Sequence, residues 1–193
     1  MPDPLTPTLP GSIPGLLRRG SPVIFASEDG CVPRHLWGKA ATVHRIAPSD
    51  LGVPLVSLTV DGCEAVVIAG LDVLALDLTD ATGRAHAAWW LAGALYPECP
   101  PSDGAAVAWQ LFPGQQPSCG WWLRYCARGD SSGSTTVSPT FSGRWNPRMW
   151  SQHIPALAPL DPDDPRLLPD GSRWVDAEAL RLVCLHVAEV ANA

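Results

Sequence analysis

The sequence predicts an α+β fold, and three observations support this class. Short stretches of alternating apolar and polar residues fill residues 21–79, a pattern typical of β-strands. Two later stretches, 81–96 and 177–191, carry apolar residues at helical spacing, and each follows an aspartate that can cap a helix. Proline and glycine account for 21 and 17 of the 193 residues, so we expect long irregular segments between these elements.

Five short strands are expected in the first part of the chain, over residues 22–27, 41–46, 54–60, 63–69 and 73–78. In the third strand, Val56, Leu58 and Val60 alternate with hydroxyl residues, so one face should be buried. The Asp61-Gly62 pair that follows predicts a type I′ hairpin turn. Five short strands joined in this way resemble a small SH3-like barrel, a fold that serves many unrelated functions.

Composition divides the chain into three parts. Residues 1–20 contain five prolines and are expected to form an extended arm, which would be ordered only by contact with a partner. Residues 21–79 make the barrel. Residues 80–193 form a Trp-rich, loop-rich α+β part with a helix, a hairpin over 107–112 and 120–127, long loops and the C-terminal helix.

The predicted C-terminal helix is apolar around most of its circumference. Leu182 and Leu185 lie outside its main apolar stripe, and a helix of this kind is normally buried by more than one neighbour. Either the irregular segment 144–171 or another subunit must cover these leucines. Because that segment carries four aspartates and six prolines, we expect another subunit.

Charge and cysteine usage exclude several classes of protein. The formal net charge is -6, which argues against broad binding to nucleic acid or to anionic lipid. Apolar runs stay shorter than the roughly 20 residues of a membrane-spanning helix. The six cysteines show no C-x-x-C or zinc-finger spacing, so no metal and no cofactor is expected. The Pro-rich first 20 residues do not resemble a secretory signal, which favours a cytoplasmic or virion location.

Nine tryptophans, against two tyrosines and three phenylalanines, indicate a binding surface. Two Trp-Trp pairs place their rings on opposite sides of one element, so one ring of each pair should reach the surface. Other tryptophans lie beside arginines, a combination typical of protein interfaces and of single-stranded nucleic acid grooves. The negative net charge favours protein. The candidate interface residues are therefore Trp90, Trp122, Trp145, Trp150, Arg144, Arg148, Leu182 and Leu185.

One segment resembles a catalytic family. Residues 143–147, with the sequence GRWNP, are similar to the opening motif of the RES-domain family, whose toxins resemble ADP-ribosyltransferases and attack NAD. In that family the Gly-Arg-Trp-Asn stretch lies in the nucleotide-binding core, so the resemblance implies an NAD site at these residues. The match ends there, because residues 148–159 contain no tyrosine where the family has a tyrosine-bearing strand.

These observations favour binding over catalysis. The sequence contains neither G-x-x-x-x-G-K nor G-x-G-x-x-G, the loops that hold phosphates. We therefore expect a non-catalytic structural or interaction protein, an oligomeric subunit of a larger assembly such as a bacteriophage virion. Two alternatives stay open: a small regulatory module that binds a protein or single-stranded nucleic acid, and a RES-like enzyme that consumes NAD.

Overall fold

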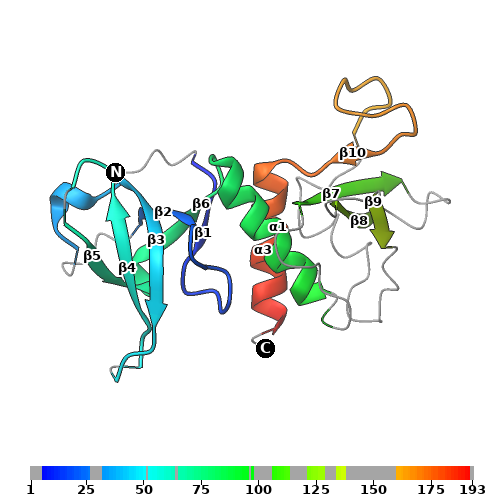
Figure 1. The fold of residues 1–193 in the computed structure, drawn as a ribbon. Coiled ribbons are helices and arrows are strands. Elements are labelled where there is room, and N and C mark those ends of the chain that lie inside the picture. Colours follow the sequence, from blue (N-terminus) through cyan, green and yellow to red (C-terminus); the bar gives the residue numbers. More distant parts are fainter. Residues whose placement is uncertain are drawn as a thin grey trace. The chain divides into compact units, whose positions relative to one another are not determined.

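The computed structural model describes residues 6–26, 32–50, 52–63, 65–95, 97, 106–113, 121–128, 134–137 and 160–191. These residues form ten strands and two α-helices (Figure 1), so the predicted α+β class is confirmed. The chain divides into two compact units, residues 1–90 and 91–193. This division falls within the first helix rather than before it.

The first unit is built on a six-stranded sheet in which every neighbouring pair is antiparallel. The strands lie in the order β1-β6-β2-β3-β4-β5, so β6 returns to the middle of the sheet and pairs with both β1 and β2. A strand is present in each of the five segments predicted to form one. The strands are β1 (Thr8–Pro10), β2 (Pro22–Phe25), β3 (Ala40–Ala47), β4 (Leu55–Val60), β5 (Val67–Gly70) and β6 (Leu74–Asp77), with short 3-10 helices η1 (Arg34–Leu36) and η2 (Leu71–Val73).

The prediction of a closed barrel is wrong. β1 and β5 are the two edges of the sheet, and no pairing joins them among the described residues. Closure would need a ladder between a three-residue strand and a four-residue strand. β1 is also poor in donors, because Pro7 precedes it and Pro10 ends it, and proline has no backbone N–H.

The turn after β4 also differs from its prediction. Gly62 has φ +75°, but no described residue other than glycine has a positive φ, so Asp61 does not take the type I′ conformation. The Cys63 N–H still donates to the Val60 carbonyl at 3.0 Å and closes a tight turn, while the Asp61 N–H donates to the Ala40 carbonyl at 3.2 Å and continues the pairing with β3. The next strand begins at Val67, later than the predicted Cys63.

The alternation predicted for β4 is confirmed and defines the core. Val56, Leu58 and Val60 are buried, whereas Thr59 on the opposite face is exposed. The other strands of the sheet contribute further buried side chains, among them Leu9, Val23, Phe25, Val43, Leu74 and Leu76.

The N-terminal segment is part of this sheet from residue 8, whereas we predicted an arm without regular structure of its own. Leu9 of β1 lies opposite Leu76 of β6, and it has no exposed surface. Ile13, Leu16 and Leu17 are buried after it. Prolines are tolerated here because β1 is an edge strand. The segment is therefore ordered by contacts within its own chain.

Helix α1 (Ala81–Leu95) begins as predicted at its cap residue. The Asp80 carboxylate accepts the Thr82 N–H at 2.6 Å, and this hydrogen bond lowers the pKa of Asp80. Gly83, which weakens a helix by propensity, is buried against β6. A Cβ at this position would overlap the Asp77 carbonyl oxygen, so the helix needs glycine there.

The second unit contains a four-stranded antiparallel sheet and helix α3 (Ala177–Ala191). The predicted hairpin is confirmed, because β7 pairs with β8 from Ala106 opposite Arg128 to Pro113 opposite Trp121. The strands of this sheet are β7 (Ala106–Pro113), β8 (Trp121–Arg128), β9 (Ser134–Val137) and β10 (Arg173–Trp174). Asp176 caps α3 by accepting the Ala179 N–H at 2.8 Å.

The two glycines of α1 give a matched test of this packing. We expect Gly83→Ala to lower the free energy of unfolding by about 1–3 kcal/mol, because the added methyl group meets backbone. At Gly93 no described atom lies within 4 Å of an added Cβ. Gly93→Ala should therefore raise stability by up to about 1 kcal/mol through helix propensity. Urea unfolding followed by circular dichroism measures both, and a stabilising Gly83→Ala would contradict the close approach.

Candidate functional site

Half of the predicted interface residues lie outside the described part of the chain. Arg144, Trp145, Arg148 and Trp150 are in this group, as is the RES-like segment 143–147 that contains two of them. Trp122 lies on β8, but its side chain is not among those described. Trp90, Leu182 and Leu185 remain to be placed.

The Trp-Trp pair of α1 serves contacts inside the first unit. Trp90 Nε1 donates a hydrogen bond to the Pro14 carbonyl at 3.0 Å. The Arg18 guanidinium lies 4.7 Å from the centre of the Trp89 ring, within the range of a cation–π contact. Both rings are half-buried. The pair therefore holds the segment after β1 against the helix.

A serine and a histidine meet beside this pair. Ser21 Oγ accepts the Arg18 backbone N–H at 3.0 Å and lies 2.9 Å from His86 Nδ1. Burial, with a smaller contribution from the positive charge of Arg18, lowers the pKa of His86 to about 4. The imidazole is therefore neutral near pH 7, and its Nδ1 shares a hydrogen bond with the Ser21 hydroxyl.

This Ser-His pair does not have the geometry of a nucleophilic centre. Ser21 has no exposed surface, so a substrate carbonyl cannot approach its Oγ. Residues 129–133, with the sequence GDSSG, match the G-x-S-x-G pattern of a nucleophile elbow, a match that the prediction of a non-catalytic protein did not take into account. That elbow joins a strand to a helix, whereas these residues fall between β8 and β9, two strands that pair with each other.

Leu182 and Leu185 are half-buried on α3. Neighbouring positions are more enclosed: Val183 and Cys184 are buried, and burial raises the pKa of the Cys184 thiol. The helix surface also carries an ion pair between Arg181 and Glu178, with 2.7 Å between nitrogen and oxygen. The two leucines are thus part of a mixed surface rather than a fully exposed apolar stripe.

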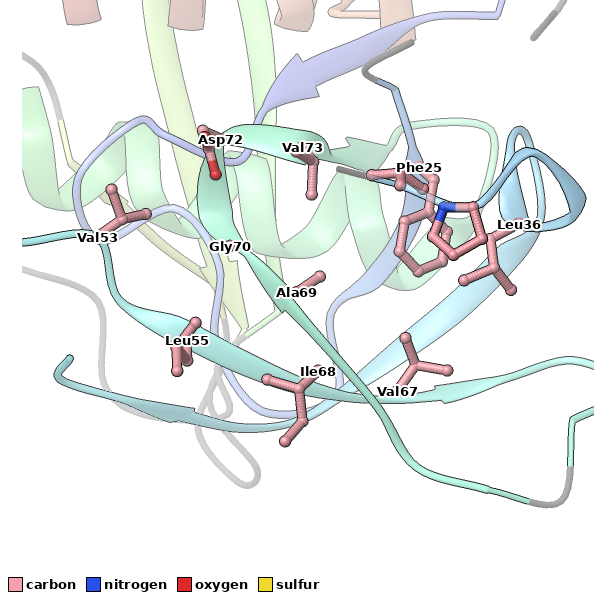
Figure 2. A pocket seen from close by; sticks show the side chains of 12 residues that line it. Phe25, Leu36, Val53, Leu55, Val67, Ile68, Ala69, Gly70, Asp72 and Val73 are labelled. Carbon is pink, nitrogen blue, oxygen red and sulfur yellow. The ribbon is translucent and has the colours of Figure 1, made fainter. Parts of the chain in front are cut away.

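A concave site lies in the first unit, beside β5. A pocket of about 360 Å³ is bounded by the end of β2 and η1, the start of β4, all four residues of β5, and η2. Figure 2 shows the side chains of Phe25 and Leu36 at one end of this pocket and those of Val53 and Leu55 at the other. We call it the β5 pocket.

The β5 pocket is apolar and opens onto an apolar surface. Ile68 on its rim is 67% exposed, and Val53 and Leu55 are 40% and 38% exposed. Asp72 is the only charged side chain among the described residues that line it. Its carboxylate lies over Gly70, where a Cβ would collide with it. The site therefore offers branched apolar side chains along most of its length and one negative charge at the end of β5.

Sequence reasoning placed a strand in this region but did not identify the site. The missed signal is the run Val66–Ala69, which contains no proline and no charged residue. Such a run is ordinary for a strand with neighbours on both sides, and only the strand order shows that β5 is an edge.

Other kinds of site are not seen among the described residues. No three His, Cys, Asp or Glu side chains in that part of the chain come together in a way that would bind a metal ion. Neither described helix is long and apolar enough to cross a membrane.

Comparison with known proteins adds no relative. No family model, curated protein or solved structure matches this chain. Any function assigned to it therefore rests on the chemistry of its own residues, above all on the β5 pocket and its rim.

The buried histidine predicts a pH dependence of stability. The pKa of His86 is about 4 in the folded chain and 6.5 as its ordinary value, so protonation favours the unfolded chain. The free energy of unfolding should be highest above pH 6.5 and fall by about 2 kcal/mol between pH 6.5 and pH 4, allowing for the partial exposure of the ring.

His86→Asn is the matched variant, because its side-chain amide can keep a hydrogen bond with the Ser21 hydroxyl but does not titrate. Urea unfolding at several pH values should show a smaller acid-induced loss in this variant than in the parent chain. Parallel pH profiles for the two proteins would contradict the assignment.

Proposed function

We propose that this chain is a non-catalytic interaction protein, a subunit of a larger assembly that binds an apolar segment of a partner protein in the β5 pocket. The observation that carries the proposal is the exposed apolar rim of the pocket, with Ile68 67% exposed on a strand that pairs on one side only among the described residues. Large apolar side chains that border a concave site mark places where proteins bind one another.

The energetics of burial support this assignment. Covering a side chain the size of Ile68 contributes about 1.5–3 kcal/mol, and Leu55 and Val53 on the same pocket would add to it. The cavity of about 360 Å³ is large enough for several aliphatic side chains. An extended segment that places apolar residues along β5 would therefore gain a large part of its affinity from desolvation.

The composition of the lining favours a protein partner over single-stranded nucleic acid. Nucleic acid grooves combine positive charge with exposed aromatic rings on which bases stack. The described lining of the β5 pocket has no positive side chain, and its aromatic ring, Phe25, is 2% exposed. Asp72 would also repel phosphates.

The same lining supports a binding role rather than a catalytic one. Asp72 is the one titratable group among the described residues of the pocket. General acid–base and nucleophilic catalysis rely on a nucleophile or on titratable groups that act together, and the pocket offers neither arrangement. Its chemistry suits recognition of an apolar surface.

A synthetic peptide tests the proposal. The probe is a fluorescein-labelled heptapeptide, Arg-Thr-Val-Thr-Val-Thr-Val with blocked ends, and its Kd is measured by fluorescence anisotropy. We expect saturable binding that weakens about tenfold or more in Ile68→Ser, because a buried isoleucine contributes at least about 1.4 kcal/mol.

Trp174→Ser is the matched control, since Trp174 is a large apolar residue that is 51% exposed on β10. Its loss should leave the Kd within about twofold of the parent value. Equal binding by Ile68→Ser and the parent chain, or loss of binding in Trp174→Ser alone, would overturn the proposed site.

A further inference from the structure

The outer edge of β5 is open for backbone hydrogen bonding. On one side β5 pairs with β4, from Leu58 opposite Val67 to Leu55 opposite Gly70. On the other side, no described residue makes a backbone hydrogen bond to β5. Alternate residues of an antiparallel strand direct their N–H and C=O groups to opposite sides, so part of the hydrogen-bonding capacity of β5 is unused within the described residues.

The two edge strands, β1 and β5, differ in how well they are protected against pairing with another strand. Edge strands are usually protected by proline, by charge or by extreme shortness. β1 is protected by proline and by shortness, because it has only three residues, follows Pro7 and ends at Pro10. β5 has no proline and no charged residue. Only the β5 edge keeps both its donors and an apolar surface.

We infer that the partner segment binds as an additional antiparallel strand on the edge of β5, with a basic residue near its N-terminal end beside Asp72. This inference rests on the proposed function and specifies how the segment is held. Peptides that bind by strand addition gain affinity from main-chain hydrogen bonds and specificity from alternate side chains in pockets.

The orientation follows from the sheet and from the position of the charge. Every pair of neighbouring strands in this sheet is antiparallel, and a further antiparallel strand continues its twist and its ladder. In that orientation, the N-terminal end of the added strand lies next to the C-terminal end of β5. Asp72 follows that end by two residues and is exposed, so a lysine or arginine of the partner meets it there.

The side chains of β5 indicate where the partner carries bulk. Ala69 and Gly70 are small, and Gly70 cannot gain a side chain without displacing the Asp72 carboxylate. Val67 and Ile68 are large and stand at the other end of the strand. Successive side chains of a strand point to opposite faces, and Ala69 shares its face with the buried Val56 opposite it. A branched apolar residue of the partner therefore fits beside Ala69, next to Phe25 and Val73 in the same pocket.

Backbone methylation of the probe peptide tests strand addition separately from pocket binding. Two further peptides carry N-methyl groups on the three valines or on the three threonines, which removes the N–H groups of one edge of the strand at a time. We expect one of the two to bind at least tenfold more weakly than the parent peptide and the other to bind within about threefold. Equal binding by all three peptides would overturn strand addition while leaving the proposed function in place.

Two more arms of the same experiment test the orientation and the function itself. A peptide with arginine moved to its C-terminal end should bind the parent chain about two- to fivefold more weakly than the original peptide does. The original peptide should bind the Asp72→Asn variant more weakly by the same factor, because exposed ion pairs contribute up to about 1 kcal/mol. A tighter Kd for the moved arginine would overturn the antiparallel orientation. Absence of binding by the unmodified peptide would overturn the proposed function together with this inference.

Discussion

The pairing of β6 is the constraint on which the first unit depends. β6 lies between β1 and β2, so both of its edges are occupied, and Leu76 faces Leu9 on one side and Val23 on the other. This arrangement captures the N-terminal segment, which has no other ladder to join among the described residues. It also prevents β6 from pairing with β5. β6 is therefore not available to close a barrel by pairing with β5, and β5 forms an edge of the sheet.

The helix that follows β6 depends on the same strand. Gly83 allows α1 to lie against the Asp77 carbonyl at the end of β6, and in this position the helix reaches the segment after β1. Trp90 bonds the Pro14 carbonyl, Arg18 lies over Trp89, and Ser21 bonds His86. Exposed tryptophans would indicate a binding surface, and a serine beside a histidine could indicate a catalytic pair, but here these groups make contacts within the first unit. These tryptophans and this histidine stabilise the fold, whereas the proposed binding site is formed by the aliphatic residues of β5 and its pocket.

The consequence for function is an asymmetric sheet. Its β1 edge is short and bordered by proline, whereas its β5 edge is apolar, uncharged and adjacent to a pocket. A partner that adds to the β5 edge would bury Ile68 and satisfy backbone groups at the same time, so desolvation and hydrogen bonding favour the same geometry. The Asp72 carboxylate would add direction, because a single charge at one end of an apolar strand distinguishes the two orientations of a peptide.

Several local elements of this protein could be predicted from the sequence alone. Alternation in β4, the aspartate caps of α1 and α3, and the β7–β8 hairpin depend on residues close in the chain, and each is present where it was predicted. The tertiary structure decided which strands became neighbours. This strand order places β1 beside β6, leaves the sheet without closure into a barrel, and makes β5 an edge strand. The run Val66–Ala69 has the same composition whether its strand lies in the middle of a sheet or at its edge. Strand order is set by contacts between residues far apart in the chain, so the candidate site could be recognised only once the sheet was known.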